Sequence, residues 1–402
     1  MKEERFGGSS PDALTETPGK VPAARLFLPF LRLGATAFGG PAMIAHIREM
    51  SVKRNRWLAD ETFQDGVALC QSMPGATAMQ MAAYVGLRAG GLRGALASFV
   101  GFGFPAFLLM LALSACYAGS GEIPPVAALF RGLQVMVVAI VANATFLFGR
   151  DIVKRSGDLI LAPVSAALFW FGASPFAVIA GAGAAGALMF RGSPFPPPFG
   201  RGGGDAGKVP RPILVFLALA CAGLAGLRFA DVKLYHLAAL MLRIDLFAFG
   251  GGFASLPLMF HEIVSVKGWL DGKTFMDGIA LGQVTPGPIV ITATFVGYLV
   301  RGLPGSIVAT GAIFTPSFAV LVCVAPFFDR LKGTRYFPGA TRGILASFVG
   351  LLFYMTIRFA VAVPWGPVKA VFGAATLVAL ARKANILHVV LVGAVLSVVL
   401  FR

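Results

Sequence analysis

The chain has 402 residues, of which 57% are hydrophobic and only 13% are charged. Soluble domains carry roughly 25% charged residues, so this composition excludes a soluble globule and indicates a protein whose solvent is the lipid bilayer. The formal net charge of +16 is spread through short loops and tails, as in chains whose cations set membrane orientation, so we expect no nucleic-acid partner.

The chain opens with a polar, Pro- and Gly-rich stretch, residues 1–25, that lacks an apolar core. We interpret it as a disordered cytoplasmic tail and not as a cleaved signal peptide. The cysteines stand singly and far apart, so neither a disulfide framework nor a zinc site is indicated. They are Cys70, Cys116, Cys221 and Cys323. We expect no cofactor and no metal.

A set of Gly- and Pro-containing motifs occurs twice, with about 211 residues between the copies. The first copy reads Phe38-Gly39-Gly40-Pro41, Trp57-Leu58, Gln71-x-x-Pro74-Gly75 and Val85-Gly86. The second copy reads Phe249-Gly250-Gly251, Trp269-Leu270, Gln283-x-x-Pro286-Gly287 and Val296-Gly297. Duplicated halves with broken apolar segments at matching positions are typical of transporters whose site lies between the repeats.

The apolar segments predict an all-α polytopic membrane protein with about thirteen transmembrane segments. In the first repeat, residues 26–190, the predicted segments are 26–47, 62–88, 92–117, 126–149, 158–173 and 174–190. A Pro/Gly-rich linker, 191–211, and a single connecting helix, 212–229, follow. In the second repeat, residues 234–401, the predicted segments are 234–259, 274–300, 303–328, 340–361, 366–381 and 385–401.

Six segments and one connecting helix make an odd number, so we expect the second repeat to enter the membrane from the opposite side, as an inverted repeat. Lysine and arginine residues in the loops favour a cytoplasmic N-terminus and an external C-terminus. If each Pro-Gly segment instead re-enters and returns on the same side, eleven spans result and the charge asymmetry weakens. The block 48–56, with four cations on the external side, fits the first arrangement poorly.

The Gly-Pro breaks are the candidate substrate site, because lipid cannot hydrogen-bond a peptide group and a break at membrane depth must line a cavity or be buried in protein. Proline suits the first turn of a helix, and a helix N-terminus binds anions. Two such termini facing each other across a pseudo-two-fold axis would suit a doubly charged oxyanion, with amide and hydroxyl groups as neutral donors. The alternative is that the breaks are kinks for close helix packing. The candidate residues are Gly39, Gly40, Pro41, Gln71, Ser72, Pro74, Gly75, Gln80, Gly250, Gly251, Gln283, Thr285, Pro286, Gly287 and Pro288.

Two arginines stand at matching positions inside apolar segments. Arg32 and Arg243 each lie six residues ahead of a Phe-Gly-Gly break. Arginine in such a place is costly, and its guanidinium binds tetrahedral oxyanions, so both are candidate substrate-binding residues. The alternative is that each side chain snorkels to the membrane interface.

Four ionisable residues are candidates for carrying coupling protons: His46, Asp65, Asp245 and Asp277. Asp65 and Asp277 match each other in Phe-x-Asp-Gly, where capping of a helix is the alternative. His46 lies near a helix end, where a cap or an interface role is the alternative. Asp245 stands where the first repeat has Gly34, and its apolar surroundings predict a buried acid.

No catalytic constellation is present in the sequence. It contains no HExxH motif, no Walker loop and no nucleophile elbow. We therefore expect no enzyme activity and no ATP-driven step on this chain.

Over nearly all of 26–401, these motifs resemble the chromate ion transporter family in its long form with two homologous halves. The resemblance rests on Phe38-Gly39-Gly40-Pro41-x4-His46, on Pro74-Gly75-x4-Gln80-x4-Val85-Gly86, and on Gly278-Ile279-Ala280-Leu281-Gly282-Gln283-Val284-Thr285-Pro286-Gly287-Pro288. It implies chromate efflux across the cytoplasmic membrane, hence chromate resistance, with sulfate as a structural analogue and thirteen helices in two inverted halves. One motif position departs from the pattern: the first Pro-Gly-Pro is Pro74-Gly75-Ala76 here, so we expect the two half-sites to differ.

The leading hypothesis is a secondary exporter of chromate, driven by the membrane potential or a proton gradient. A sulfate-type uptake transporter, an anion channel and a membrane scaffold without flux are the alternatives. The expected partners are the dianion and the lipid bilayer. The small-residue run 181–186 allows close helix contact within or between protomers, so a homo-oligomer is also compatible with the sequence.

Overall fold

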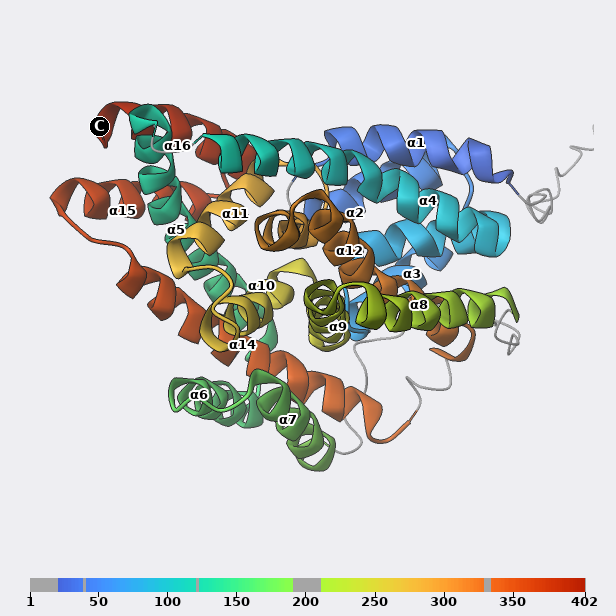
Figure 1. Cartoon of the computed structure of the whole chain (residues 1–402). Coiled ribbons are helices and arrows are strands. Elements are labelled where there is room, and N and C mark those ends of the chain that lie inside the picture. The colour runs from blue at the N-terminus through green and yellow to red at the C-terminus, as the bar shows by residue number, and fades with distance from the viewer. Residues whose placement is uncertain (1–20, 39–40, 121–122, 191–210, 329–333, 402) are drawn as a thin grey trace, which may run out of the picture.

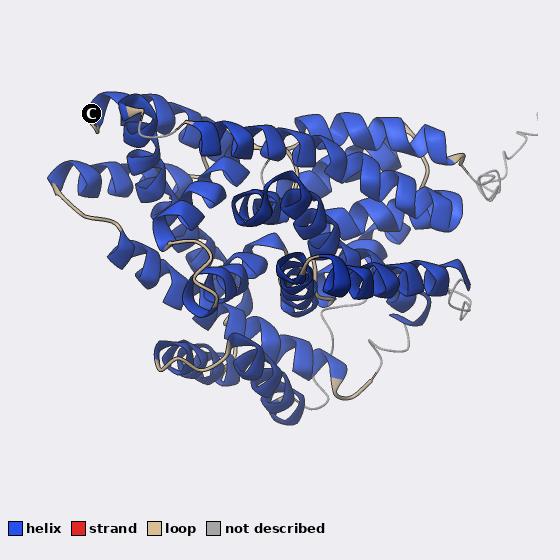
Figure 2. Ribbon diagram, viewed as in Figure 1, coloured by secondary structure: helices blue, strands red, loops and turns tan. Residues whose placement is uncertain are grey.

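The computed structural model describes residues 21–38, 41–120, 123–190, 211–328 and 334–401. Within these ranges every regular element is a helix, as Figure 2 shows. The all-α prediction is therefore confirmed for the described residues. Most of the predicted tail, 1–25, and nearly all of the predicted linker, 191–211, lie outside them.

The same series of helices occurs twice along the chain, on either side of one connecting helix (Figure 1). The first series is α1 (Ala23–Thr36), α2 (Pro41–Arg48), the π-helical turn η1 (Glu49–Arg54), α3 (Asp60–Ser72), α4 (Thr77–Gly119), α5 (Pro124–Ile152), α6 (Ser156–Trp170) and α7 (Pro175–Met189). The connecting helix is α8 (Arg211–Ala230). The second series is α9 (Val232–Phe247), α10 (Gly252–Phe260), η2 (His261–Val266), α11 (Gly272–Val284), η3 (Ile289–Ile291), α12 (Thr292–Val324), η4 (Ala325–Phe327), α14 (Phe337–Ala362), α15 (Pro367–Ala381) and α16 (Ile386–Leu400).

The long helix α4 turns back on itself at Gly91, whose φ of +68° is a conformation that glycine adopts without strain. Its two halves lie against each other, because the Ser98 hydroxyl donates to the Ala82 carbonyl (2.7 Å) and Gly86 packs on the Gly94 backbone. The counterpart α12 turns at Gly302 (φ +62°), and there the hydroxyls of Thr294 and Thr310 are 2.7 Å apart. Each of these long helices is thus a helical hairpin.

The segments expected at 62–88 and 274–300 are not single spans, so this part of the prediction is wrong. Each consists of a helix, the Pro-Gly break and the first half of the next helix. The two parts fold back on each other, since Gly66 in α3 packs against the Tyr84 ring in α4 and Gly278 packs in the same way against Phe295. The helix α3 has 13 residues, or roughly 20 Å, which is too short for a hydrocarbon core of about 30 Å. The re-entrant alternative therefore describes these segments better.

The segments expected at 26–47 and 234–259 also turn back at their Phe-Gly-Gly breaks. In the second repeat, Arg243 of α9 forms an ion pair with Glu262 of η2. In the first repeat, the Phe30 ring of α1 stacks on the Trp57 ring, with 6.4 Å between their centroids. A straight helix through the break would hold these partners far apart. Each repeat therefore begins with two hairpins of half-length helices, and we call the break at the end of each hairpin its tip.

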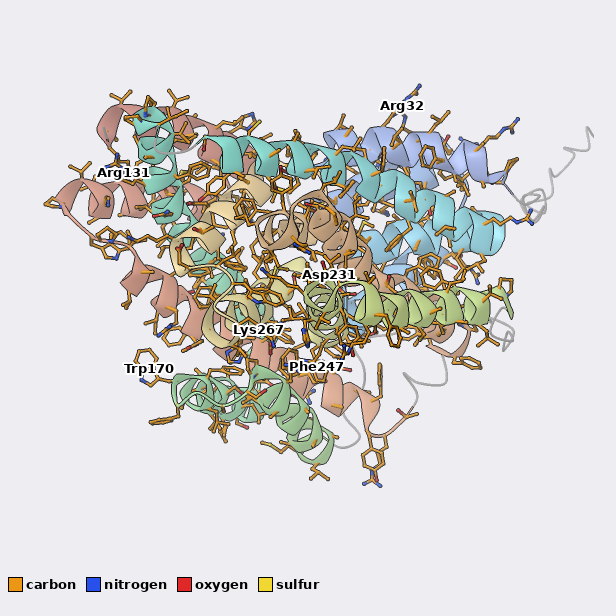
Figure 3. All side chains as sticks on the ribbon, in the orientation of Figure 1. Arg32, Arg131, Trp170, Asp231, Phe247 and Lys267 are labelled. Atoms are coloured by element: carbon orange, nitrogen blue, oxygen red, sulfur yellow. The ribbon has the colours of Figure 1, made fainter. Side chains whose placement is uncertain are left out.

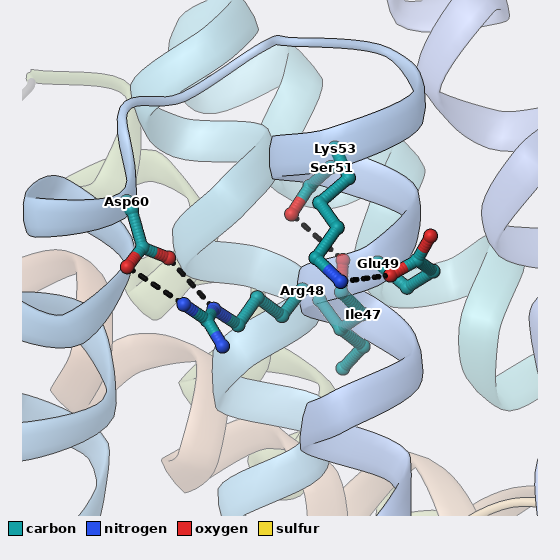
Figure 4. Close-up of polar contacts among 6 residues, drawn as sticks. All are labelled: Ile47, Arg48, Glu49, Ser51, Lys53 and Asp60. Atoms are coloured by element: carbon teal, nitrogen blue, oxygen red, sulfur yellow. Dashed lines mark hydrogen bonds and ion pairs between the residues drawn. The ribbon is translucent and has the colours of Figure 1, made fainter.

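The loop between the two hairpins of the first repeat is fixed by ion pairs (Figure 4). The Arg48 guanidinium donates to both carboxylate oxygens of Asp60 at 2.6 and 2.7 Å, and it lowers the pKa of that carboxyl. Lys53 pairs with Glu49 at 2.9 Å. Two of the four cations in the block 48–56 are thus matched by local acids.

Five helices among the described residues are long and apolar enough to cross a membrane: α4, α5, α8, α12 and α14. The most apolar window of α8 is only 6% buried, so most of this connecting helix is left uncovered by the rest of the described chain. The chain is an integral membrane protein.

Each repeat also ends in a pair of 15-residue helices that packs on the long helix of the other repeat. The pair α6 and α7 packs on α14, and the pair α15 and α16 packs on α5 (Figure 1). Gly186 lies so close to the Gly339 carbonyl that a Cβ would approach it to 2.4 Å. Two glycines of the run 181–186, Gly183 and Gly186, therefore allow α7 to pack closely on α14 within the same chain.

The two repeats meet around an approximate two-fold axis. The hydroxyl groups of Thr145 in α5 and Thr356 in α14 are 3.0 Å apart, and these residues are 211 positions apart in the sequence. That separation equals the spacing of the repeated motifs. Only residues near such an axis can contact their own counterparts, so the axis passes through the crossing of α5 and α14.

Candidate functional site

The four hairpin tips pair across the repeats. The Gly75 N–H, in the Pro-Gly tip of the first repeat, donates to the Ala248 carbonyl, next to the Phe-Gly-Gly tip of the second repeat (2.9 Å). The reciprocal bond runs from the Gly287 N–H to the Ala37 carbonyl, also at 2.9 Å. Pro74 and Phe249 add an isolated antiparallel bridge. The repeated breaks that the sequence singled out are thus brought together in space.

Helix N-termini gather at these tips. The residues immediately before α4, α10 and η3 are Ala76, Gly251 and Pro288, and none of them caps its helix with a side chain. The first turn of a helix has N–H groups without intrahelical partners and carries about half a positive charge. Pro41 is the first residue of α2, as the proline rule predicts, whereas Gly39 and Gly40 lie outside the described residues. This arrangement of amide donors suits an anion.

Glycine is required at the tips, because the backbone there is left-handed and closely packed. The φ values are +118° at Gly75, +100° at Gly287, +93° at Gly250 and +90° at Gly251. A Cβ at Gly75 would lie 2.3 Å from the Ser317 hydroxyl, and a Cβ at Gly287 would lie 2.8 Å from the Ala106 methyl. The tips therefore have little room to shift while they are paired.

The Pro-Gly tip of the second repeat holds a free donor. Among the described residues, the buried amide nitrogen of Gln283 has no hydrogen-bond partner. Thr285 is buried, and its hydroxyl donates to the Leu281 carbonyl (2.8 Å). Pro286, Gly287 and Pro288 are buried as well. An unpaired buried donor is costly unless a ligand or water accepts from it.

The Pro-Gly tip of the first repeat has a different chemistry. Gln80 is fully buried and its amide nitrogen donates to the Pro74 carbonyl (2.7 Å). The Ala76 N–H donates to the Ser317 hydroxyl (2.9 Å), and Ser317 in turn donates to Asp245. Asp245 is 1% exposed, which confirms the expected buried acid. The two Pro-Gly tips therefore differ, as we expected from Ala76 in the place of the second proline of the Pro-Gly-Pro motif.

Three predicted residues, two candidate substrate ligands and one candidate proton carrier, have exposed side chains. Arg32 is exposed on α1 and points outward (Figure 3). Gln71 is exposed near the end of α3, and His46 is exposed on α2. Gln71 precedes the Pro74-Gly75 tip by three residues, as Gln283 precedes the other tip, but its side chain is exposed and not buried at the tip.

Arg243 lies in a separate polar groove. Its guanidinium pairs with Glu262, which is 8% exposed, and its Cζ atom lies 3.8 Å from the centre of the Phe176 ring. The groove is a cavity of about 490 Å³ whose lining includes His236, His261 and Lys267, the last of which is marked in Figure 3. Arg243 therefore joins α9, η2 and α7 at some distance along α9 from the tip.

We expect Arg243→Ala to reduce stability by about 1–2 kcal/mol, because it leaves the Glu262 carboxylate without its partner; the half-exposed arginine keeps the loss below that of a fully buried pair. Thermal unfolding in detergent measures it. Adding Glu262→Gln removes the orphaned charge, so the double variant should regain stability and transport. A stable double variant without transport would instead make Arg243 a substrate ligand.

Asp277 lies within α11, where it is held by two donors from other helices. Tyr117 of α4 donates to one carboxylate oxygen (2.9 Å) and Gln134 of α5 to the other (2.8 Å). The cap of α11 is Asp271, which accepts from the Lys273 and Thr274 N–H groups. The capping interpretation of Asp277 is therefore wrong.

Asp65, the counterpart of Asp277, also lies within its helix, beyond the first turn of α3, and is partly buried. Capping therefore does not explain it either. Among the described residues no cluster of three or more His, Cys, Asp or Glu side chains could hold a metal ion.

Sequence reasoning missed Ser317, Tyr117 and Gln134, which supply the donors to the two buried acids. Ser317 follows Pro316, whose counterpart in the first repeat is Pro105. This repeated proline could have directed attention to Ser317. The other two lie outside the repeated motifs and carry no such signal.

A duplicated, apolar, helical chain whose broken helices pair across the two repeats has the architecture of a membrane transporter. The family model of the chromate transporter matches residues 24–187 and again residues 235–398. The chain belongs to the chromate transporter family.

Relatives cover most of the chain. An uncharacterized transporter of Methanocaldococcus jannaschii is 43% identical over 388 residues, which span 93% of this chain and 94% of the relative. A chromate transport protein of Cupriavidus metallidurans is 30% identical over 85% of this chain and 84% of the relative. One from Pseudomonas aeruginosa is 30% identical over 87% and 84%, respectively. No solved structure matches this chain.

Proposed function

We propose that this protein carries chromate, a tetrahedral dianion, across the cytoplasmic membrane, and that the dianion binds where the four tips meet. The observation that carries the proposal is the gathering of uncapped helix N-termini beside the unpaired amide nitrogen of Gln283. The relatives named as chromate transport proteins support the choice of substrate. The proposed ligands are the backbone N–H groups in the first turns of α4 and α10 and of Gly250 and Gly251, with Gln283 as the side-chain donor. The N–H groups of Gly75, Ala76 and Gly287 already donate within the protein.

Amide donors suit a transported dianion better than buried arginines do. A fixed guanidinium would hold the dianion by charge and slow its release, whereas helix N-termini carry only partial charge. The donors sit on tips that pair across the repeats, so opening one pair would change the site. Alternating access then requires the two pairs of tips to open in turn.

We propose that the second repeat is inverted relative to the first. In the first repeat, the Val21 N–H donates to the Ala89 carbonyl beside the Gly91 turn (2.9 Å). In the second repeat, Asp231 pairs with Arg301 beside the Gly302 turn (2.7 Å). Each repeat thus starts on the side where its long hairpin turns, and one crossing by α8 separates the two starts. Loop cations support a cytoplasmic N-terminus and an external C-terminus.

The proposed direction is export. Moving one elementary charge is worth about 2.3 kcal/mol per 100 mV, so a dianion leaving a negative interior gains about 4.6 kcal/mol at that potential. The membrane potential therefore favours export, which would confer chromate resistance. Sulfate-type uptake must overcome the same electrical free energy and therefore needs a coupling ion. The anion-channel alternative predicts flux that does not saturate with dianion concentration.

The test is chromate accumulation by inside-out vesicles that contain the protein, at a fixed potential and several pH values. We expect saturable accumulation that sulfate inhibits and that rises as the vesicle lumen is made more positive. Empty vesicles and vesicles with the Gly287→Leu variant serve as controls. Absence of chromate and sulfate accumulation in correctly inserted protein would overturn the proposal.

A further inference from the structure

A buried acid lies directly behind the Pro-Gly tip of the first repeat. One carboxylate oxygen of Asp245 accepts from both the backbone N–H and the hydroxyl of Ser317, each at 2.7 Å. The Ser317 hydroxyl also accepts from the Ala76 N–H (2.9 Å). A single hydroxyl thus links the acid on α9 to the first residue after Pro74-Gly75, in the other repeat.

We call Asp245, Ser317 and Gln80 the acid cluster. Two further oxygens of this cluster are acceptors without donors. The second carboxylate oxygen of Asp245 and the amide oxygen of Gln80 are both buried, and neither has a hydrogen-bond partner in the described part of the chain. Asp245 is 1% exposed and Gln80 is fully buried. An ionised carboxylate buried without a positive partner is costly. One proton on Asp245 removes the charge and turns an unpaired acceptor into a donor.

No cation of the packed elements compensates Asp245. The helix α9 packs on α8, α10 and α12. The basic residues with described side chains on α9, on these helices and on η2 are Lys233, His236, Arg243, Arg228, Arg301 and His261, and the acid on η2 is Glu262. Lys233 and His236 are exposed, and His261 lines the groove that holds Arg243. Arg228 lies over the Tyr235 ring, Arg301 pairs with Asp231, and Glu262 pairs with Arg243. The helix α4 contributes Arg88 and Arg93, which flank its turn at Gly91.

The acid is present on one side of the pseudo-two-fold axis only. The repeat places Gly34 opposite Asp245 and Ala106 opposite Ser317. At the second Pro-Gly tip, Gly287 accordingly packs on the Ala106 methyl instead of a hydroxyl. A site that only bound a symmetric dianion would not need this difference. The first tip offers unpaired acceptors, whereas the second tip offers the unpaired Gln283 donor.

We propose that Asp245 is a proton-binding site of the transport cycle, and that Ser317 and Gln80 couple its protonation to the pairing of the Pro74-Gly75 tip with the second repeat. The proposal rests on the proposed function and deepens it. While the tips are paired, Asp245 holds a proton. When the tip moves away, water reaches the carboxylate and the proton leaves. Asp245 takes up its proton from the aqueous phase that reaches it before the tip pairs and releases it to the opposite phase when the tip opens, so each cycle moves one proton across the membrane with no covalent step.

The coupling follows from the hydrogen bonds of Ser317. Its hydroxyl has one proton to donate and can accept from two groups. With Asp245 protonated, the cluster is neutral and can stay dry behind the tip. With Asp245 ionised, the buried charge draws in water, which competes with the bond between Ala76 and Ser317. Ionisation thus favours the open tip, and the paired tip favours the proton.

The first experiment measures chromate flux and proton flux together in proteoliposomes with a pH-sensitive dye in the lumen. Wild-type protein should move protons with chromate. Asp245→Asn, the neutral isostere of the protonated acid, should exchange chromate without moving protons, and its exchange rate should not vary with pH. Glu61→Gln, an exposed acid in the first turn of α3, is the matched control and should behave as wild type.

Ser317→Ala provides a graded test. It removes a donor that stabilises the ionised carboxylate, so the pH midpoint of chromate flux should move upward by about one unit. A purely structural role of Ser317 would lower the rate at every pH without moving the midpoint.

Two results would overturn the inference: chromate flux without proton flux in the wild type, or unchanged proton flux in Asp245→Asn. If no dianion is carried at all, the proposed function fails, and the inference is decided by infrared difference spectroscopy of the detergent-solubilised protein. A protonated-carboxyl band that titrates with pH in the wild type and is absent from Asp245→Asn supports the proton site. The same band in both proteins would overturn it.

Discussion

Gly75→Ala is expected to reduce chromate flux by about 100-fold or more while the protein still inserts into the membrane. Gly75 has a φ of +118°, which an L-residue adopts only with strain. Its new Cβ would lie 2.3 Å from the Ser317 hydroxyl and 2.8 Å from the Gln80 amide nitrogen. The tip must therefore shift away from Ala248, and displacements of about 1 Å at a positioned site can cost about 100-fold in rate. The initial rate of chromate accumulation in inside-out vesicles measures the effect.

The matched control is Gly181→Ala in α7, where a Cβ would meet nothing within 4 Å. This variant should transport as the wild type does, because alanine favours a helix more than glycine does. Membrane yield and elution as a single peak in detergent establish that both variants are folded. A folded Gly75→Ala protein with flux within about two-fold of Gly181→Ala would remove the Pro74-Gly75 tip from the transport path.

The repeated motifs identified the breaks from sequence, but not the direction that the chain takes after each break. Residues 62–88 are apolar and long enough for one span, and their hydropathy is the same whether the helix continues or turns back. The turn depends on α3 packing against the first half of α4, with Gly66 against Tyr84. The pairing of tips is similarly hidden, since the bonds of Gly75 to Ala248 and of Gly287 to Ala37 join backbone atoms.

Charged residues in apolar segments were predicted with uneven success. Asp245 was recognised as a buried acid because its surroundings on α9 are apolar in sequence as well as in space. Arg243 was expected near the tip, but the hairpin brings Glu262 beside it and holds it in another groove. The role of Ser317 could not be predicted, because a serine in an apolar helix usually bonds its own backbone.

Arg342→Ala is expected to lower the free energy of unfolding by about 3 kcal/mol, since it breaks a buried ion pair by removing one partner. Asp158 of α6 is fully buried and is held by the Arg342 guanidinium of α14, through Nε to one carboxylate oxygen (2.8 Å) and through a second nitrogen to the other. Without Arg342, the carboxylate keeps the bonds from the Lys154 and Arg155 N–H groups but has no charge partner. Unfolding in detergent, followed by circular dichroism, gives the change.

The duplication supplies the control for this prediction. Arg131 is the first-repeat counterpart of Arg342, and Lys369 is the second-repeat counterpart of Asp158. Because both counterparts are cations, the equivalent ion pair cannot form between them. Arg131 is exposed (Figure 3), and Arg131→Ala should change stability by less than about 0.5 kcal/mol. Adding Asp158→Asn to Arg342→Ala removes the orphaned charge and should restore part of the loss. Equal effects of the two arginine variants would mean that the pair between α6 and α14 does not anchor the terminal hairpin, and that apolar packing alone holds it.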